Sequence, residues 1–412
     1  MTKKHHKKIA NKKKVNKKKV SIIISCIIGV VILIILIYYL IGYIRVKNAK
    51  VEVKLVDNLK LEFNEKVYVS DLITSINGKI IDDYEIDTTK VGEHDITFHF
   101  INDENIELGY TFEIEVVDNV APVIWLGNSY NIAVNSDIDL TKKILCGDNI
   151  DEKPKCEVVG EYDLTKIGKY NLVFKAKDKS GNETNKDFVL NVYEPTKSNN
   201  NTTEIKYLDY HDVYNNYKND KTKIGIDVSK WQGDIDFTSL KDSGVEFVMI
   251  KLGGYQNGEY YVDSKFVQNI KAANELGIDV GVYFYSQANS VKQAKKDAEW
   301  VLDKLEDYYI NMPVAFDWEE WANFNDYNLS FFGLTSVADK FLKTVKNDGY
   351  DVMLYSSKNY LDNIWLPIKY DIWLAQYTKN PTYEGQFKMW QRTDKGKVKG
   401  IKGAVDIDIY YN

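Results

Sequence analysis

The chain has 412 residues, of which 44% are hydrophobic and 28% are charged, and its formal net charge is −6. This length predicts several domains, and the hydrophobic content excludes a mostly disordered chain. Residues 1–19 carry ten lysines and no acid, so the rest of the chain is more acidic than the net charge indicates. That balance argues against nucleic acid as a partner.

The first predicted element is the uncharged segment Val20–Ile44. As a helix it would be roughly 37 Å long, enough to cross a bilayer with tilt. The basic flank predicts a cytoplasmic tail at 1–19 and an extracytoplasmic location for everything after Arg45. A cleaved signal peptide is the alternative, but its apolar region usually has only about 7–15 residues. Cys26, in a loose resemblance to a lipoprotein box, opens the apolar segment and does not close it, so we expect an uncleaved single-pass anchor.

An internal repeat follows the anchor. The stretch EIDTTKVGEHDITFHF (85–100) aligns with EYDLTKIGKYNLVFKA (161–176), and each continues into a strand of alternating polarity. We therefore expect two small β-sandwiches, at residues 50–118 and 119–193. The repeated element, with AKDKSGN in the second copy, resembles bacterial immunoglobulin-like modules of surface proteins. This resemblance implies spacers or weak wall-binding units.

Two cysteines of the second repeat, Cys146 and Cys156, would lie where oxidation is possible. Their spacing leaves both a disulfide and two free thiols open. In the first repeat, His94 and His99 lie within a predicted strand, and we expect them to be sheet residues and not ligands.

A polar segment rich in Asn and Lys, residues 194–222, predicts a linker. Its stretch YLDYHDVYNNY permits an alternative in which this part packs on a neighbouring domain.

From Lys223 to the C-terminus, apolar strand patterns alternate with amphipathic helical patterns, and the helices thin out after about residue 355. This order predicts an α/β barrel related to the (β/α)8 plan, with an open doubly wound sheet as the alternative. No G-x-G-x-x-G or P-loop follows any strand, so nucleotide binding is not supported. The strand patterns are KIGIDVSKW, FVMIKLG, DVGVYFYS, PVAFDWE, DVMLYSS, YDIWLAQY, FKMWQRT and VDIDIYY.

Residues 223–412 contain neither histidine nor cysteine. This excludes Ser-His and Cys-His nucleophilic systems and zinc held by His or Cys from this part of the chain. Acid–base chemistry must then come from Asp, Glu, Tyr or Lys.

The stretch VAFDWEEW (314–321) places three acids at the end of a buried strand pattern. Residues two apart in a strand share a face, so Asp317 and Glu319 would point inward, and Phe316 and Trp318 outward. Glu320 would point outward or begin the following loop. Two close carboxylates repel, which raises at least one pKa, as a general acid requires.

Further acids, Asp227, Asp406 and Asp408, are predicted near other strand ends. A ring of carboxylates at one mouth is typical of a glycosidase. Caps or turns, and a divalent-metal site built from four carboxylates, remain as alternatives. Seven of the eight tryptophans lie in this part; Trp390 and Trp321, near strand ends, are the better candidates for a cleft that stacks sugars.

Six phrases in this order resemble glycoside hydrolase family 25, the lysozyme-type muramidases, across residues 223–412. They are GIDVSKWQG (225–233), GVYFYSQA (281–288), AFDWE (315–319), WLAQY (373–377), MWQ (389–391) and VDID (405–408). Two phrases depart from the family pattern: KLGGYQNGEY (251–260) after the second strand and Tyr283-Phe284-Tyr285 after the third.

The resemblance implies a flattened (β/α)5β3 TIM-like barrel that hydrolyses the β-1,4 bond between N-acetylmuramic acid and N-acetylglucosamine in peptidoglycan. It implies Glu319 as general acid and Asp317 as the partner that orients the substrate's 2-acetamido group. It implies no cofactor and no metal. The substrate-binding residues that it implies are Asp227, Asp406, Tyr283, Tyr355 and Trp390.

Together these features predict a multidomain, membrane-anchored muramidase whose catalytic domain lies outside the cell membrane and acts on glycan strands. Tethering favours local wall remodelling, for example opening the mesh for an envelope-spanning assembly, over general lysis. The alternative is a catalytically inactive wall-binding or structural surface protein.

Overall fold

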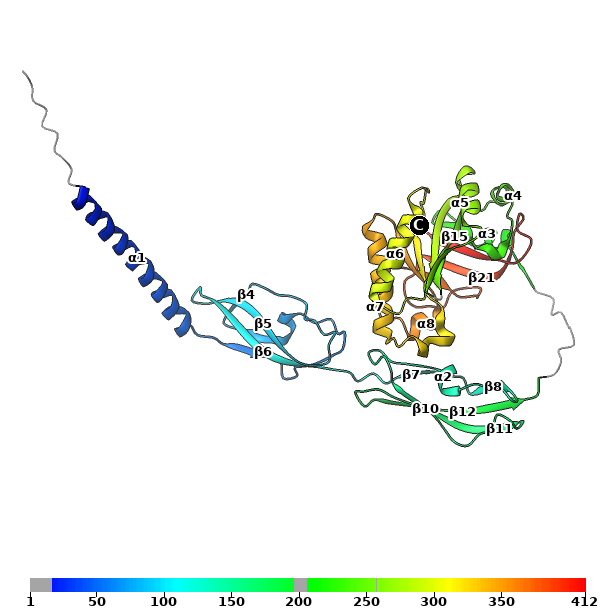
Figure 1. Ribbon diagram of the computed structural model, residues 1–412, viewed down its shortest axis with the longest axis horizontal. Helices are drawn as coiled ribbons and strands as arrows, with labels where there is room; N and C mark the ends of the chain where they lie inside the picture. The colour runs from blue at the N-terminus through cyan, green and yellow to red at the C-terminus, as the bar shows by residue number, and fades with distance from the viewer. Residues whose placement is uncertain (1–16, 196–205, 257) are drawn as a thin grey trace, which may run out of the picture. The chain divides into compact units, whose positions relative to one another are not determined.

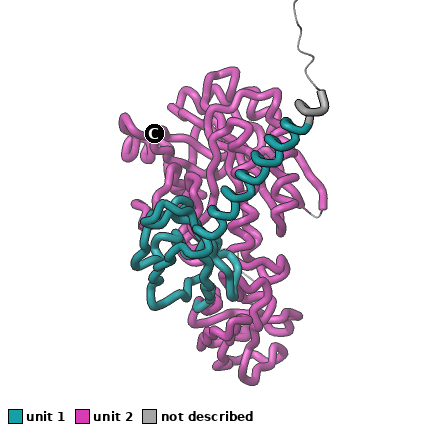
Figure 2. The backbone as a smooth tube through the Cα atoms, turned by 90° about the vertical axis from the view of Figure 1, so that its left-hand side faces the viewer, with its two compact units in different colours: residues 1–119 teal, residues 120–412 magenta. Residues whose placement is uncertain are grey.

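The computed structural model describes residues 17–195, 206–256 and 258–412, with side chains from Ile22 onward. The chain forms two compact units, residues 1–119 and 120–412 (Figure 2). The predicted basic tail at 1–19 lies almost wholly outside the described residues, as does the part of the predicted linker at 196–205.

The N-terminal element is the helix α1 (Lys17–Asn48), drawn in dark blue in Figure 1. Its segment Ile22–Asn48 is long and apolar enough to cross a bilayer, with a hydropathy of 3.1 and none of its most apolar window buried against protein. A helix of this kind near the N-terminus fits an anchor or a signal sequence, and either would direct the rest of the chain out of the cytoplasm.

The first β module, residues 50–118, is a four-stranded sheet in the order β2-β6-β5-β4 with a separate antiparallel pair, β1 and β3. Its strands β5 and β6 alternate buried and exposed side chains, as strands with one face on a core do. Phe98, Phe100 and Val116 are completely buried there. The elements are β1 (Val53–Leu55), β2 (Lys60–Glu62), η1 (Val69–Leu72), β3 (Ile73–Ile76), β4 (Gly78–Ile80), β5 (Gly92–Asn102) and β6 (Glu107–Val117).

The second β module, residues 120–193, has a four-stranded sheet in the order β10-β11-β12-β8 and a two-stranded sheet of β7 and β9. Its core includes Phe174 and Leu190, both completely buried. Cys146 on β9 and Cys156 on β10 form a disulfide that ties the small sheet to the large one. The elements are β7 (Val123–Trp125), β8 (Ser129–Ala133), α2 (Leu140–Lys143), β9 (Leu145–Gly147), β10 (Lys155–Val159), β11 (Gly168–Lys177) and β12 (Glu183–Tyr193).

The repeated sequence element forms the same turn in both modules. The Asp87 carboxylate accepts hydrogen bonds from the backbone and hydroxyl of Thr89, and in the second module Asp163 does the same with Thr165. Tyr170 donates its hydroxyl to the carbonyl of Lys166, and the ring of His94 bonds the corresponding carbonyl in the first module, that of Lys90. These local hydrogen bonds explain why the Asp and Thr positions recur in the repeat. They also show that His94 is a turn-fixing sheet residue, as the sequence predicts.

The third part of the chain is a closed barrel. Seven parallel strands, β14, β15, β17, β18, β19, β20 and β21, pair in that order, and β22 runs antiparallel between β21 and β14. This closure rules out the open doubly wound sheet. The strands are β14 (Thr222–Val228), β15 (Phe247–Gln256), β17 (Asp279–Tyr285), β18 (Val314–Asp317), β19 (Val352–Ser357), β20 (Asp371–Ala375), β21 (Met389–Lys397) and β22 (Val405–Tyr411), with β16 (Glu259–Val262) and β13 (Leu208–Asp209) added at β15 and β21.

Helices follow the first five barrel strands, and among the described residues none lies between the last three, as the sequence predicts. Side chains inside the barrel, such as Met249, Ala315 and Met389, form one core, and the outward residues pack with the helices in a second, larger core. The helices are α3 (Tyr210–Tyr217), α4 (Phe237–Asp242), α5 (Phe266–Glu275), α6 (Val291–Leu305), α7 (Phe331–Asn347) and α8 (Lys358–Asn363), with the 3-10 turns η2 (Lys230–Gln232) and η3 (Glu320–Asp326).

The predicted linker at 194–222 is wrong for its second half. Residues 208–217 form β13 and α3, and Tyr210 is completely buried in the barrel's outer core. Its hydroxyl donates to the carbonyls of Ile224 and Gly244, both at 3.0 Å. The apolar and aromatic residues of YLDYHDVYNNY pack on the barrel although the stretch is polar in composition. The alternative in which this stretch packs on a neighbouring domain is therefore correct.

Candidate active site

A cavity of 310 Å³ opens at the carboxyl ends of the barrel strands, where barrel folds place their sites. It brings together six of the seven predicted site residues: Asp227, Tyr283, Asp317, Glu319, Tyr355 and Asp406. Six residues without a predicted role complete the lining: Ser229, Trp231, Lys251, Trp373, Tyr377 and Gln391.

The strand β18 and the turn after it place the two central carboxylates. On β18, Ala315 belongs to the inner core and Phe316 to the outer core, so Asp317 faces the cavity. Trp318 is completely buried on the outer side, where its indole donates to the carbonyl of Ala288 at 3.2 Å. Glu319 was expected within this strand, but it lies two residues beyond the end of β18, as the N-cap of η3, and it still lines the cavity.

Burial governs the protonation of this pair. It raises the pKa of the Asp317 carboxyl well above its usual range; the charge of Glu319 adds to the rise and Lys251 opposes it. Burial also raises the pKa of Glu319, again against the effect of Lys251, and Glu320 adds to this rise. The Oδ1 atom of Asp317 is buried and accepts no hydrogen bond from the residues that the structure describes. The pair therefore offers a carboxyl able to hold a proton near neutral pH and an acceptor free for a ligand.

The neighbouring Glu320 has the opposite environment. Its carboxylate accepts hydrogen bonds from the hydroxyl of Tyr285 at 2.5 Å and the amide of Gln287 at 2.6 Å. Burial opposes ionisation, but these hydrogen bonds outweigh it and hold the pKa of Glu320 below its usual value. The pKa values of the adjacent Glu319 and Glu320 thus shift in opposite directions. Such a difference allows one carboxyl to act as an acid while the other stays ionised.

A hydrogen-bonded layer beneath the pair fixes the remaining polar groups. The amide of Gln391 donates to Asp227 at 2.7 Å, and its oxygen accepts from the hydroxyls of Tyr355 at 3.0 Å and Tyr377 at 2.9 Å. The indole of Trp373 donates to Asp408 at 2.8 Å. Asp408 is completely buried below the cavity, so its part is to support the site from beneath.

The other acids of this cluster also have raised pKa values. Burial raises the pKa of Asp227 and of Asp408 well above the usual range; Asp408 adds to the rise at Asp227, and Asp406 to the rise at Asp408. Burial together with Asp227 and Asp394 raises the pKa of Asp406 to about 9. Near neutral pH the cluster thus holds protons that keep its total charge low.

Comparisons with known proteins identify the family of this part of the chain. The family model of the glycosyl hydrolases family 25 matches residues 226–401. Protein YegX of Escherichia coli (strain K12) is 30% identical over 196 residues, which cover 45% of this chain and 68% of YegX. The chain belongs to glycosyl hydrolase family 25.

The chain is also similar to a lysozyme and to a solved family 25 structure. The autolytic lysozyme of Clostridium acetobutylicum is 31% identical over 187 residues, 45% of this chain and 54% of that protein, so the chain spans about half of its length. A family 25 glycosyl hydrolase structure from Bacillus anthracis is 25% identical, covers 48% of this chain and 92% of that chain, and has a TM-score of 0.42.

One predicted site residue of this family 25 domain is placed wrongly by the sequence. Trp390 is completely buried in the outer core, where its indole donates to the carbonyl of Gln376 at 2.8 Å and its ring meets Tyr217 at 5.5 Å. Side chains alternate along β21, so Gln391, the next residue, faces the cavity instead. Trp321, the other cleft candidate, stacks on Tyr360 at 3.9 Å and is not part of the cavity lining.

Two prominent groups of the cavity were not predicted from the sequence. Trp231 is 81% exposed at its rim, in the η2 turn after β14. Lys251 lies on β15, with its ammonium 4.6 Å from the ring centre of Tyr285 and 5.7 Å from that of Tyr283. The sequence feature that could have indicated Lys251 is its single charge within the apolar stretch FVMIKLG. Such a charge in a central strand must face a polar interior.

Proposed function

We propose that the barrel is a muramidase that hydrolyses the β-1,4 bond between N-acetylmuramic acid and N-acetylglucosamine in peptidoglycan. The observation that carries this proposal is the Asp317–Glu319 pair, two buried carboxyls with raised pKa values in an acid-lined cavity of a family 25 domain. The relative described as an autolytic lysozyme, from Clostridium acetobutylicum, supports the choice of substrate.

In this proposal the pair shares one proton before the reaction. Substrate binding places the 2-acetamido N–H of the N-acetylmuramic acid against the unpaired Oδ1 of Asp317, which stabilises the ionised form of Asp317 and leaves the proton on Glu319. Glu319 donates that proton to the glycosidic oxygen as the C1–O bond breaks, and the acetamido oxygen closes on C1. Water then attacks C1 and loses a proton to the Glu319 carboxylate, and the bond between C1 and the acetamido oxygen breaks.

The surrounding residues have supporting parts in the same proposal. Lys251 lowers the repulsion within the acid cluster, since it opposes the raised pKa values of both central carboxyls. Asp227, Asp406, Tyr283 and Tyr355 present polar atoms to sugar hydroxyls. The exposed ring of Trp231 at the rim supplies the stacking face that the sequence assigned to Trp390. No step needs a metal or a cofactor.

The rest of the chain sets where this activity takes place. We propose that α1 is an uncleaved anchor with its lysine-rich end in the cytoplasm, and that both β modules are immunoglobulin-like units in front of a (β/α)5β3 barrel. The single apolar helix, the ten lysines before it and a wall substrate are consistent with one another. A tethered enzyme reaches only nearby glycan strands, which favours local remodelling, for example around an envelope-spanning assembly.

The test is product analysis with the full chain in detergent micelles on purified peptidoglycan. New reducing ends should be N-acetylmuramic acid, identified by borohydride reduction and mass spectrometry. Glu319→Gln should lower kcat by about 10²–10⁴-fold because it removes the general acid. The matched control Glu384→Gln, on an exposed loop, should leave kcat unchanged.

Two other results would contradict the proposal. Reducing ends of N-acetylglucosamine would show cleavage of the other glycosidic bond. Binding of peptidoglycan without any new reducing ends, by a wild-type chain with folded circular dichroism, would favour the inactive wall-binding protein.

A further inference from the structure

The second β module contacts the barrel at the segment that directly follows Glu319. Leu145 on β9 belongs to the outer core of the barrel, and Val123 and Trp125 on β7 pack against that core. Gly147 on β9 lies so close that a Cβ atom there would be 2.6 Å from Phe331 and 2.9 Å from Phe324. At Gly147 the two surfaces therefore pack so closely that they leave no room for a side chain.

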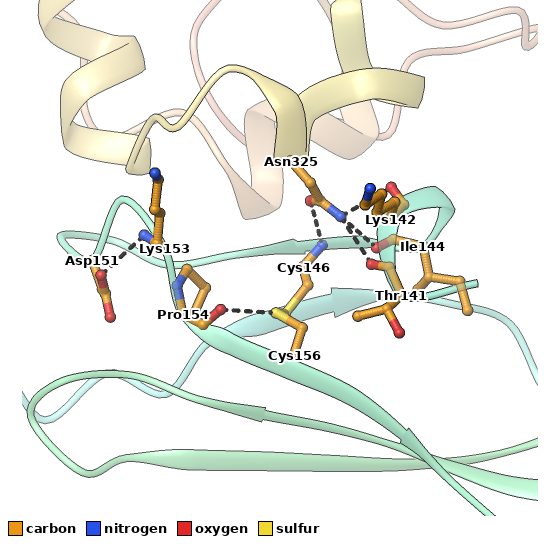
Figure 3. Close-up of a disulfide and its surroundings, with 9 residues drawn as sticks. All are labelled: Thr141, Lys142, Ile144, Cys146, Asp151, Lys153, Pro154, Cys156 and Asn325. Atoms are coloured by element: carbon orange, nitrogen blue, oxygen red, sulfur yellow. Dashed lines mark hydrogen bonds between the residues drawn. A yellow bond between two sulfur atoms is a disulfide. The ribbon is translucent and has the colours of Figure 1, made fainter. Parts of the chain in front are cut away.

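The side chain of Asn325, in η3, holds most of the polar contacts in this interface (Figure 3). Its amide group donates to the carbonyls of Ile144 at 2.9 Å, Lys142 at 3.2 Å and Thr141 at 3.3 Å. Its oxygen accepts a hydrogen bond from the backbone N–H of Cys146 at 3.1 Å. The carbonyls at the end of the short helix α2 have no partner within that helix, so Asn325 satisfies groups that would otherwise be left unpaired.

A second set of hydrogen bonds holds the start of α7, where the segment after Glu319 ends. The backbone N–H groups of Phe331 and Phe332 donate to the carbonyls of Asp148 at 2.8 Å and Asn149 at 2.9 Å. The first N–H groups of a helix have no partner within it. The module supplies these acceptors and so fixes where α7 begins.

Aromatic packing extends from the module to the strand that carries Asp317. Trp125 lies 5.3 Å from Tyr360, Tyr360 stacks on Trp321 at 3.9 Å, and Trp321 meets Trp318 edge-on at 4.8 Å. Trp318 stands between Asp317 and Glu319 in the chain. Displacement of the module would therefore loosen the packing directly behind both carboxyls.

We propose that the second β module is an intramolecular scaffold for the catalytic turn, and that Asn325 is the positioning residue through which it holds Glu319 in place. The disulfide between Cys146 and Cys156 supports this role because it joins the contacting strand β9 to the main sheet of the module. The inference rests on the proposed muramidase function for its kinetic consequence. The module is thus more than the spacer that its sequence resemblance implies.

The first test uses Asn325→Asp in the full chain. This change keeps the size and the acceptor but removes the donors and places a negative charge against three carbonyl oxygens. We expect kcat to fall by roughly 10- to 100-fold, because small misplacements of a catalytic group have effects of this size, and KM to change little. The matched control is Asn328→Asp just after η3, where the exposed side chain donates to the carbonyl of Asp326 and to no other group among the described residues; its kcat should be unchanged.

The second readout is the basic limb of the kcat–pH profile, which reports the proton on Glu319. Burial is the main reason that the pKa of Glu319 is raised, so a loosened η3 admits water and moves this limb to lower pH in Asn325→Asp. A change that only weakened folding would reduce the active fraction and leave the limb in place. Each variant adds one carboxylate to the segment, and a nearby negative charge would raise the pKa of Glu319, so a shift to lower pH reports loss of burial. The other ionisable groups around Glu319 are unchanged: Lys251, Asp227, Asp317, Glu320, Asp406, Tyr285, Tyr355, Tyr360 and Tyr377.

A change made in the module alone should give the same result. Gly147→Ala pushes β9 away from Phe331 and Phe324 without altering a barrel residue, so we expect the same fall in kcat and the same shift of the limb. Combining it with Phe331→Leu, which frees space, should restore part of kcat. Unchanged kcat and pH limb in folded Asn325→Asp and Gly147→Ala, beside an active wild type, would overturn the inference.

Hydrogen exchange separates this inference from the proposed function. Amides 320–326 should exchange faster in Asn325→Asp and Gly147→Ala than in wild type, whichever reaction the barrel catalyses. A wild-type chain without hydrolysis would refute the muramidase proposal, whereas equal exchange of these amides in all variants would refute the scaffold.

Discussion

The two sides of the barrel wall at VAFDWEEW differ sharply. The inner side presents Asp317 and then Glu319 to the cavity, with raised pKa values and a buried oxygen that no described residue satisfies. The outer side buries Phe316 and Trp318 completely and satisfies the indole N–H of Trp318. Buried carboxyls without partners are unfavourable, whereas buried aromatic side chains stabilise.

This difference shows how one short segment serves two purposes. The outer side chains hold the backbone rigidly enough for the inner ones to stay in an unfavourable environment. The same outer packing continues through Trp321 and Tyr360 to the second β module. Changes on the inner side should therefore affect catalysis with little loss of stability. Loss of an outer side chain away from the turn after β18, such as Trp390, should mainly reduce stability.

The largest effect is expected for Asp317→Asn on the inner side. It removes the carboxylate proposed to orient the acetamido group, so kcat should fall by about 10²–10⁴-fold. The melting temperature should stay equal or rise, since a neutral amide replaces a buried acid. Proton NMR of the wild-type reaction should show the β anomer first, because assistance by the acetamido group gives two inversions at C1.

The control for this prediction is Asp220→Asn, an exposed acid in a turn, which should change neither quantity. An initial α product from the wild type would contradict the acetamido mechanism and favour direct attack by water. A large fall in melting temperature for Asp317→Asn would contradict the assignment of this residue to function.

Trp390→Ala tests the outer side. Its ring is completely buried, so its loss should destabilise the barrel by about 3–5 kcal/mol, with kcat and KM of the folded fraction almost unchanged. Urea unfolding monitored by near-UV circular dichroism measures the loss. Trp231→Ala provides the contrast, because that exposed ring should affect KM and leave stability unchanged. A raised KM at unchanged stability in Trp390→Ala would restore the sequence-based assignment to the cleft.

The strands β18 and β21 differ in how far a local sequence pattern determines which side chains face inward. On β18, alternation was enough to place Asp317 inside and Phe316 outside. The two residues are adjacent, one is charged and the other is a large apolar ring, so only one of them suits the packed outer face. On β21, both Trp390 and Gln391 are plausible inward residues, and only the register with β20 and β22 decides between them. That register depends on contacts between distant parts of the chain, which a local pattern does not contain.

The eight barrel strands were predictable because each is a short apolar stretch bounded by polar turns. The contact of the second β module with η3 was not predictable. It depends on Asn325, one amide among many in a polar segment, and on the absence of a side chain at Gly147. Composition does not distinguish such residues from ordinary loop positions, since their importance arises only when two folded surfaces meet.

A further prediction concerns Asp406 and the pH dependence of stability. Its pKa is raised to about 9 by burial and by Asp227 and Asp394, against 3.8 ordinarily. Between these values the folded chain keeps a proton that the unfolded chain releases. The contribution of Asp406 to stability is therefore largest below pH 3.8 and falls as the pH rises to 9, by at most about 1.4 kcal/mol per pH unit.

Asp406→Asn stays neutral at every pH, so its stability relative to wild type should increase between pH 5 and pH 8. Melting temperatures at both pH values measure this, with Asp220→Asn as the control that should track wild type. Equal pH slopes for Asp406→Asn and wild type would contradict a retained proton. The slope should become shallower without vanishing, because Asp227 and Asp408 are raised in the same direction and remain. A difference in slope would then show that Asp406, on the inner side of the wall, contributes to the change in stability between pH 5 and pH 8.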